Sequence, residues 1–332
     1  MAKPTWNAGD LNAVLTSYTQ NYLNRKIVNQ SFESHPLLDD LRAAKKSYDG
    51  GTQIVLPVLD GYTPAGGTVT RGATITLTHT DAITRAQYQP VWYYEPVVLD
   101  WTDESQAVGA GATLSYVEAN LDAGLLRLQE KIATDVCAAT TATNGVGSLL
   151  AYIDSTGSIG GINPATAGQT WWAAYENSSV GSFASNGAGV MRDALLGVSK
   201  YKMLGRPNKI YASITAWKEY AKSGLSLATV NFTSTSASGR TTDIGTGSLN
   251  YEGIPVVYEP HLDDLEASLS GVMLGVNTSA IMLCEKASAF EASPWVDLTP
   301  GGRLARACTL KWCGNLVMQA RSPLFKLAGI TA

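Results

Sequence analysis

The sequence has few of the side chains that catalysis, metal binding and disulfide bonding need. Its 332 residues include only three histidines and four cysteines. The cysteines lack the CxxC spacing of zinc sites and redox motifs, so we expect reduced and mostly buried thiols. This scarcity argues against an active site built on titratable groups that converge in a cleft. The cysteines are Cys137, Cys284, Cys308 and Cys313.

Long hydrophobic runs are missing as well. No stretch approaches the about 18 apolar residues that a membrane-spanning helix needs. The first residues, Met1-Ala2-Lys3-Pro4, do not open an apolar core of the length found in signal peptides. We therefore expect a soluble chain that stays in the cytosol and contacts no membrane.

The signatures of common active sites are also absent. The sequence contains no GxSxG nucleophile elbow, no HExxH zinc motif and no GxxxxGK[ST] phosphate loop. His261 precedes Asp263 and Asp264, and this group could form a metal site or an acid–base pair, but we favour a solvated turn. Gly109-Ala110-Gly111 is only part of a phosphate-binding fingerprint, which we interpret as a hinge. We expect no catalytic residue, no metal and no cofactor.

The charge balance limits the contacts that this chain could make with nucleic acid. Lys and Arg number 24 and Asp and Glu 28, which gives a net charge of −4. Because tight phosphate binding needs a clustered basic surface, this balance argues against wrapping DNA but permits enclosing it. The hydrophobic fraction of 45 % is enough for a sizeable core, in one large domain or two modest ones.

The most prominent expected element is a long helix over 111–143. Ser115 and Glu118 have the spacing of a capping box, and Asn144-Gly145 is typical of a helix exit. About 28 residues at about 1.5 Å each would make a spine about 42 Å long, although an ordinary surface helix is also compatible with the pattern. The apolar stripe that predicts this helix consists of Leu114, Val117, Leu121, Leu125, Leu128, Ile132 and Val136.

A long β-hairpin is expected upstream of this helix. Residues 52–59 form a β-branched apolar run, and from 68 to 80 threonine alternates with apolar residues, interrupted at Gly72. The chain returns through the aromatic segment 85–96, so we predict that 68–80 and 85–96 form a two-stranded ribbon. Such a ribbon is marginal alone, and either the chain's own core or a neighbouring copy must cover it; we favour the neighbour. The expected inter-subunit contact residues are Val69, Ala73, Ile75, Leu77, Tyr88 and Trp92.

The rest of the chain mixes helices and strands without a βαβ rhythm, which predicts an α+β fold. A short helix is expected after His35-Pro36, with three leucines on one face. Trp171-Trp172 is typical of an aromatic anchor for a loop. The other expected elements are helices over 190–204 and 215–224 and strands over 209–214, 253–258, 272–276, 281–284, 304–312 and 315–320.

The order of these parts resembles the tailed-bacteriophage major capsid (coat) protein family, with its Johnson or Hong Kong 97-type fold. Each motif is weak alone, but their order covers nearly the whole chain. The matching stretches are His35-Pro-Leu-Leu-Asp-Asp-Leu41, Gly50-Gly51, the strand at 54–59, the hairpin at 61–97, the helix at 112–143, Ile159-Gly-Gly-Ile162, Trp171-Trp172, 253–257 and 314–317.

The resemblance implies a subunit made of five parts. These are an N-terminal arm over 1–50, a strand and extended-loop hairpin over 51–100, a peripheral domain with the spine helix over 101–184, an axial domain over 185–275, and peripheral-domain strands with the C-terminus over 276–332. No lysine lies between Lys46 and Lys131, so the lysine cross-link that some members form is not available on this loop.

The function implied is structural and not enzymatic. Such subunits assemble through hexamers and pentamers into an icosahedral shell around double-stranded phage DNA, which this chain would contact weakly and without sequence specificity. The expected partners are copies of itself, a portal protein and a separate scaffolding protein. The expected location is the virion capsid, after assembly in the cytoplasm of the host bacterium.

Two alternatives stay open. An encapsulin-like cellular compartment would use the same fold and would carry a groove that docks cargo. A cytosolic carbohydrate-active or hydrolytic enzyme could use Trp171-Trp172 as a sugar platform, but the lack of a credible acid–base pair counts against it.

Overall fold

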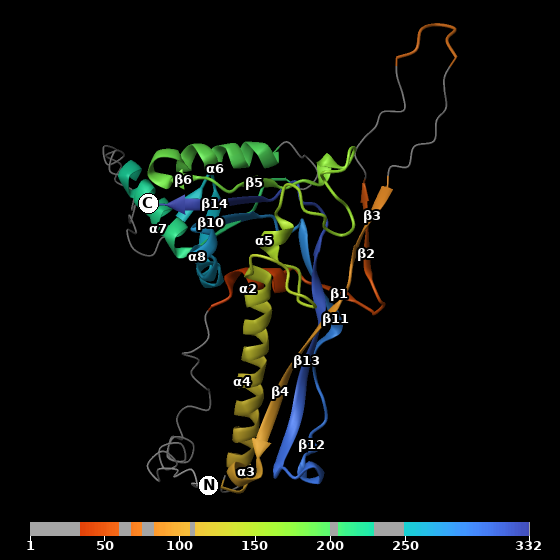
Figure 1. Ribbon diagram of the computed structural model, residues 1–332, viewed down its shortest axis with the longest axis vertical. Coiled ribbons are helices and arrows are strands. Elements are labelled where there is room, and N and C mark those ends of the chain that lie inside the picture. Colours follow the sequence, from red (N-terminus) through yellow and green to blue (C-terminus); the bar gives the residue numbers. More distant parts are fainter. Residues whose placement is uncertain are drawn as a thin grey trace, which may run out of the picture. The chain divides into compact units, whose positions relative to one another are not determined.

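The computed structural model describes residues 34–59, 68–74, 83–106, 110–199, 205–228 and 249–331 (Figure 1). The chain divides into two compact units, which we describe separately. Of the described residues, those of unit 1 lie within 92–132 and 288–312, and those of unit 2 lie within 34–91, 133–287 and 313–331. No helix in the described ranges is long and apolar enough to cross a membrane.

Unit 1 packs most of a long helix against strands. Helix α4 (Ala110–Cys137) approaches so closely at Gly124 that a Cβ there would lie 2.6 Å from Val97 Cγ2 and 3.1 Å from Leu310 Cδ1. Only glycine allows this contact, which joins α4 to two neighbouring strands. The unit also holds β4 (Val91–Asp100), α3 (Trp101–Gln106), β12 (Val296–Asp297), η3 (Thr299–Gly301) and the adjoining parts of β11 (Ile281–Ala292) and β13 (Ala305–Met318).

The predicted spine helix is confirmed, and its predicted start at residue 111 lies within one residue of the observed start, but the predicted capping box and the predicted end at residue 143 are wrong. Helix α4 begins at Ala110, so Ser115 lies inside the helix and not at a capping box. It ends at Cys137, and Asn144, with a φ of 61°, belongs to a later turn. A tertiary contact explains the early end, because the Ser148 hydroxyl donates to the carbonyl of Ala138 at 2.5 Å.

Unit 2 is built around a seven-stranded mixed sheet in the order β5-β14-β10-β7-β9-β8, with β6 also paired to β14. The central strand β10 is antiparallel to both neighbours and is buried at all six residues, as a central strand should be. The strands are β5 (Tyr175–Asn177), β6 (Gly181–Ser182), β7 (Lys209–Ala212), β8 (Leu249–Tyr251), β9 (Ile254–Tyr258), β10 (Gly271–Val276) and β14 (Phe325–Thr331).

Two helices cover this sheet with their apolar sides (Figure 1). They are α6 (Phe183–Ser199) and α7 (Ile214–Ala228), and they also contact each other. Met191 and Leu195 of α6 join Met273 and Phe325 of the sheet in one buried cluster. The remaining described elements of unit 2 are α2 (Pro36–Ala43), β1 (Lys46–Tyr48), β2 (Ile54–Leu59), β3 (Ile83–Tyr88), α5 (Leu149–Tyr152), η1 (Thr170–Trp172), η2 (Pro260–Leu265) and α8 (Glu266–Leu269).

The short helix after Pro36 is confirmed as α2, with its three leucines buried. The N–H of Leu37 donates to Glu259 Oε2 at 2.8 Å, and β1 runs parallel to β11. The described residues from 34 to 48 are therefore part of unit 2. A helix with one apolar face must bury that face, and here it does so within its own chain.

The predicted ribbon is paired differently. Strand β3 pairs with β2, in the register Ile54 to Tyr88, and the described residues 68–74 form no pair with it. Residues 68–74 form no strand: the Ala73 N–H donates to the Thr70 carbonyl at 3.1 Å across a turn in which Gly72 has a φ of 86°. Glycine at the interrupted position of the threonine pattern makes this turn possible. Residues 75–82 lie outside the described residues.

The prediction that the acidic turn near His261 is solvated is wrong. His261 is buried, with its Nδ1 3.2 Å from Glu259 Oε1 and its ring centroid 4.8 Å from that of His35. Asp263 and Glu266 accept hydrogen bonds from the backbone N–H groups of Ile214 and Thr215 at 2.7 and 2.8 Å. These carboxylates, and not a cap by Thr215, satisfy the first turn of α7.

Several predicted boundaries also shift. Helix α6 begins seven residues before the predicted start at 190, and β11 continues to Ala292 instead of ending at 284. The strands expected over 304–312 and 315–320 form one strand, β13, which passes through Gly314 without a break. The strands expected near 209–214, 253–258 and 272–276 are confirmed as β7, β9 and β10.

Candidate subunit interface

The β2–β3 ribbon of unit 2 has an apolar outer face. Side chains alternate along β2, so Ile54 and Val58 are buried while Val55, Pro57 and Leu59 are exposed to different degrees. Leu59 lies opposite Ile83 of β3, and these two side chains are 59 % and 69 % exposed. Exposed aliphatic residues on adjacent strands form a contiguous surface that favours a partner. We name Val55, Pro57, Leu59 and Ile83 the ribbon patch.

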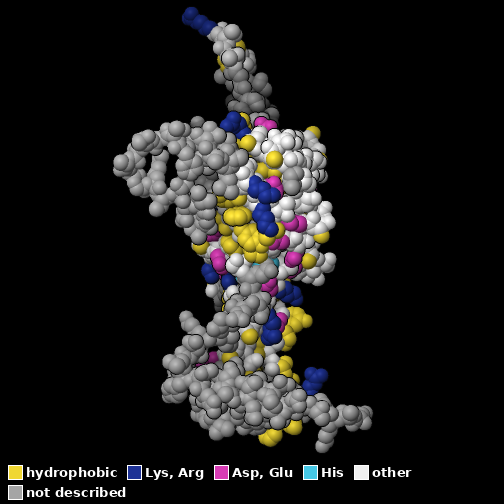
Figure 2. Space-filling view, turned by 90° about the vertical axis from the view of Figure 1, so that its left-hand side faces the viewer, with side chains coloured by type: hydrophobic (Ala, Val, Ile, Leu, Met, Phe, Trp, Pro, Cys, Tyr) yellow, Lys and Arg dark blue, Asp and Glu magenta, His cyan; other side chains and the backbone are white. Residues whose placement is uncertain are grey.

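A second apolar surface lies on β4 in unit 1. Its odd-numbered residues Tyr93, Val97 and Leu99 are buried, and the ring of Tyr93 meets that of Trp312 edge-on at 5.7 Å. The even-numbered residues from 92 to 98 point the other way and are exposed, although they are also apolar. We name Trp92, Tyr94, Pro96 and Val98 the strand patch. In the space-filling view, hydrophobic side chains reach the surface in several places among charged ones (Figure 2).

The structure describes four of the six expected contact residues. Val69 and Ala73 are exposed in the segment 68–74, and Trp92 is exposed within the strand patch. Tyr88 is only 4 % exposed, and its hydroxyl donates to the Met318 carbonyl at 3.3 Å. Burial raises the pKa of this phenol. Tyr88 is thus a core residue of the subunit, so we remove it from the candidate interface.

Ile75 and Leu77, the other two expected contact residues, lie outside the described residues. Most of both patches was not predicted from the sequence, since the patterns of 52–59 and 85–96 were interpreted only as β-forming runs. The signal was present: in 54–59 and 91–100 both alternating faces are apolar, although an exposed strand needs only one apolar face.

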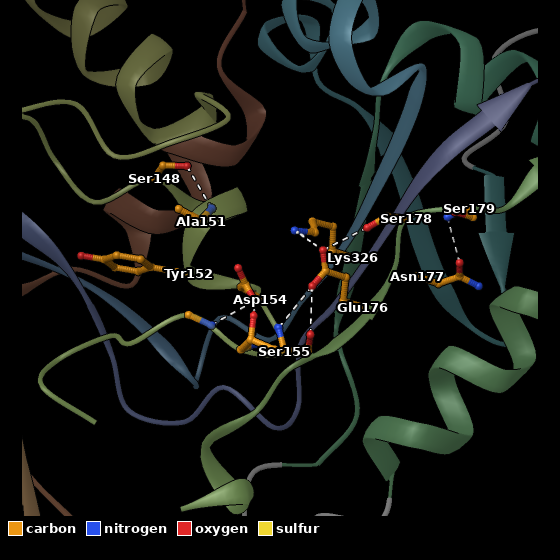
Figure 3. Close-up of polar contacts among 12 residues, drawn as sticks. Ser148, Ala151, Tyr152, Asp154, Ser155, Glu176, Asn177, Ser178, Ser179 and Lys326 are labelled. Atoms are coloured by element: carbon orange, nitrogen blue, oxygen red, sulfur yellow. Dashed lines mark hydrogen bonds and ion pairs between the residues drawn. The ribbon is translucent and has the colours of Figure 1, made fainter. Parts of the chain in front are cut away.

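A polar cluster fixes the loop that follows α5 (Figure 3). The carboxylate of Glu176 accepts hydrogen bonds from the N–H and the hydroxyl of Ser155, both at 3.2 Å, and from the Ser178 hydroxyl at 3.0 Å. It also forms an ion pair with Lys326 Nζ at 2.8 Å. Asp154 Oδ1 accepts from the N–H groups of Thr156 and Gly157 at 2.6 and 3.1 Å. These contacts tie the loop to β5 and β14.

The electrostatics of this cluster suit a structural role. Burial opposes ionisation of Glu176, but its hydrogen bonds and the charge of Lys326 outweigh burial and hold the pKa of this carboxyl below its usual value. Burial likewise opposes ionisation of Asp154, and the N–H groups of Thr156 and Gly157 outweigh it and lower that pKa. A general acid needs a raised pKa, so this pair is poorly suited to glycoside hydrolysis.

We expect the subunit to lose stability in acid. Glu176, Asp154 and Glu266 all have a pKa below the usual value, so the stabilisation that they provide is present above about pH 4.5 and is lost as pH falls through the lowered pKa values. The melting temperature, measured by circular dichroism from pH 7 to pH 3, should fall most steeply below about pH 4.5. Glu176→Gln should melt lower at pH 7 and show a flatter decline, and an unchanged slope would contradict this assignment.

The loop also encloses a buried arginine. Arg321 is fully buried, and its guanidinium donates to the backbone carbonyls of Tyr152 and Gly157 at 2.8 Å each and of Asp154 at 2.5 Å. The planar fork of arginine reaches all three acceptors at once, which a lysine cannot do. Arg321 therefore joins the end of β13 to the loop after α5.

Comparison with solved structures identifies the fold. No protein-family model and no curated protein matches the sequence. Among solved structures, the cyanophage A-1(L) capsid matches with a TM-score of 0.62 at 14 % identity, covering 95 % of this chain and 98 % of that one. A structure of Mycobacterium phage Bobi matches with a TM-score of 0.57 at 12 % identity, covering 97 % and 98 %.

A third match comes from a cellular shell. The holo-SrpI encapsulin complex from Synechococcus elongatus PCC 7942 has a TM-score of 0.56 at 9 % identity and covers 98 % of this chain and 96 % of its own. At such low identity these similarities concern the fold, and in each case they extend over nearly the full length of both chains. The chain therefore has the α+β fold of the tailed-phage capsid proteins, the Hong Kong 97-type fold that the order of its sequence motifs predicted.

Proposed function

We propose that this chain is a structural major capsid protein of a tailed bacteriophage. The observation that carries the proposal is the presence of two exposed apolar surfaces, the ribbon patch and the strand patch, on a chain that shares its fold with capsid subunits. Monomeric soluble proteins rarely expose such surfaces, and repeated copies of one subunit can cover them in a symmetric assembly. In this proposal the subunits form hexamers and pentamers that close into an icosahedral shell.

The proposal also assigns a role to each part of the subunit. The segment between β2 and β3 serves as the extended loop, residues 101–184 and 276–332 form the peripheral domain, and 185–275 form the axial domain. Val69, Ala73, Ile75, Leu77 and Trp92 contact neighbouring subunits, together with the ribbon patch and the strand patch. The low net charge of −4 suits a wall that encloses double-stranded DNA without binding it tightly.

The remaining partners are also part of the proposal. The shell is built in the host cytoplasm with a separate scaffolding protein, takes a portal protein at one vertex and remains as the capsid of the virion. The role is structural, without catalysis or a cofactor.

An encapsulin-like compartment is the second candidate, and the match to the encapsulin complex supports it. The two candidates differ in what the shell encloses. Particles purified from the native source should contain nuclease-protected DNA if the protein is a phage capsid, and a co-purifying cargo protein if it is a compartment shell.

The purified protein should form rings, shells or mixed tubes, because both apolar patches are exposed in the described part of one subunit. Light scattering after size-exclusion chromatography, at several protein and salt concentrations, and negative-stain microscopy provide the measurement. A chain that stays a 35.1 kDa monomer under all these conditions, with and without a co-expressed scaffolding protein, would refute the proposed function.

A further inference from the structure

Three consecutive residues at the base of the ribbon form hydrogen bonds with distant segments of unit 2. The N–H of Gln87 donates to the Gly160 carbonyl at 2.9 Å, and the Tyr88 hydroxyl donates to the Met318 carbonyl at 3.3 Å. The carbonyl of Gln89 accepts from Asn315 Nδ2 at 2.7 Å. The partners of Gln87, Tyr88 and Gln89 come from the turn at 159–162 and from β13, which lie far away in the sequence. We name these three contacts the ribbon anchor.

The turn that holds Gln87 is itself rigid. Ile159 and Ile162 form a two-way backbone bridge, with both N–H···O distances 3.1 Å. Between them Gly160 and Gly161 have φ values of 64° and 83°, which suit a tight hairpin turn with two left-handed residues. Trp172 Nε1 donates to the Ile159 carbonyl at 3.2 Å, which holds the turn from its other side. The Gly160 carbonyl is thus a fixed point for β3.

The two glycines of this turn differ in one respect. A Cβ at Gly160 would lie 3.0 Å from the Cβ of Ala86 and 3.1 Å from Cζ of Tyr88, both in β3. A Cβ at Gly161 would meet nothing within 4 Å. The backbone of the turn therefore calls for glycine at both positions, but only Gly160 is also needed for the close approach of the ribbon.

Asn315 fixes the other end of the anchor. This buried side chain donates to Gln89, and its Oδ1 accepts from the N–H groups of Gly147 and Leu316 at 3.0 and 2.7 Å. Beside the anchor is an open depression of about 430 Å³ that Pro90 and other residues line. On this open side the hydrogen bonds of Gln87 and Gln89 hold the ribbon, while Tyr88 packs into the core.

We propose that Gly160 and Asn315 are positioning residues that set the direction of the ribbon and thereby select the geometry of the assembly. The inference rests on the proposed function and adds to it two residues that determine the geometry of the assembly. A head-to-tail contact closes into a ring only at particular rotations, and other rotations give open filaments. A change at the ribbon anchor should therefore leave the ribbon patch able to bind but should misdirect it, so that irregular products replace closed shells.

The test compares Gly160→Ala with Gly161→Ala. Both variants place alanine at a positive φ and should lower the melting temperature similarly, but only Gly160→Ala should disturb β3. In the unassembled subunit, hydrogen exchange at the Gln87 amide should accelerate roughly tenfold in Gly160→Ala and remain unchanged in Gly161→Ala. In negative-stain images Gly160→Ala should give tubes, open sheets or particles of mixed diameter, while Gly161→Ala gives the wild-type particle.

Two further variants guard against simple misfolding. Asn315→Asp keeps the size and the Oδ1 acceptor but removes the donor to Gln89, and it should give the same irregular products. Gly160→Ala combined with Ala86→Gly removes the 3.0 Å contact but keeps the 3.1 Å contact with Tyr88, so it should increase the share of regular particles relative to Gly160→Ala without restoring the melting temperature. Rescue of assembly without rescue of stability would distinguish positioning from a general loss of folding.

Three outcomes would count against the inference. Wild-type particles from both Gly160→Ala and Asn315→Asp would overturn it, as would irregular particles from Gly161→Ala, since turn strain would then be the cause. Unchanged exchange at Gln87 in Gly160→Ala would show that the ribbon is not anchored there. A wild-type chain that never assembles would refute the proposed function instead, and the exchange measurement on the free subunit would still decide whether the anchor exists.

Discussion

Leu59→Asp combined with Ile83→Asp should leave the subunit folded and abolish shell formation. The two residues lie opposite each other on the outer face of the ribbon and are largely exposed, so the core of the subunit loses little. In a shell each would carry a charge into an apolar contact. The association free energy should weaken by about 1.5 to 3 kcal/mol per side chain because apolar burial is lost, and the desolvation of each charge weakens it further. This loss recurs at every copy of the interface.

Circular dichroism and a melting curve would check the fold of this variant, and negative-stain microscopy would check its assembly. Leu59→Met combined with Ile83→Val is the matched control, because it changes the same two positions but keeps them apolar, and it should still form shells. Regular shells from the aspartate variant would show that the ribbon patch is not an interface. An unfolded aspartate variant would show instead that this face belongs to the subunit's own core.

Arg321→Met should greatly reduce the stability of the folded subunit. Methionine fills much of the space but leaves the carbonyls of Tyr152, Asp154 and Gly157 buried without their donor. At roughly 1 to 3 kcal/mol for each unsatisfied group, the free energy of unfolding should fall by about 5 kcal/mol. For a chain of 332 residues that corresponds to a decrease in melting temperature of about 7 °C, which a thermal melt followed by circular dichroism would measure.

Arg206→Met is the control for this experiment, because Arg206 pairs with Glu252 at the surface, where an ion pair contributes little. It should melt within about 2 °C of the wild type. Arg321→Lys should fall between the two, since one ammonium group cannot reach three divergent carbonyls. If Arg321→Met melted as Arg206→Met does, the loop after α5 would not depend on this residue.

Local patterns predicted the elements whose structure is set by their own residues. The apolar stripe from Leu114 to Val136 predicted α4, and β-branched runs predicted β2, β9 and β10. The ends of elements were less predictable because distant groups decide them. Ser148 binds the carbonyl of Ala138 and ends α4, and Asp263 satisfies the first turn of α7 from 49 positions away. No periodicity within a helix contains that information.

The candidate interface was predictable only in part, and for a related reason. An alternating strand with one apolar face indicates which side is buried, but β4 carries apolar residues on both faces. The sequence alone does not say which face α4 covers and which stays exposed, so Tyr94 and Val98 were not predicted. Tyr88 was assigned to the interface because it lies in the predicted ribbon. Its burial was not predictable, because its partners, Met318 and Tyr152, come from distant segments.

The contacts of Arg321 also constrain the order of events during synthesis. The guanidinium binds carbonyls that precede it by 164 to 169 residues, so the loop after α5 cannot be completed until residue 321 has been made. Residue 59 leaves the ribosome about 260 residues earlier, which at about 5 to 20 residues per second is a delay of roughly 13 to 50 s. During that interval the ribbon patch is present on a nascent chain whose later segments do not yet exist. The yield of soluble subunit should therefore depend on how well the host's chaperones shield nascent chains.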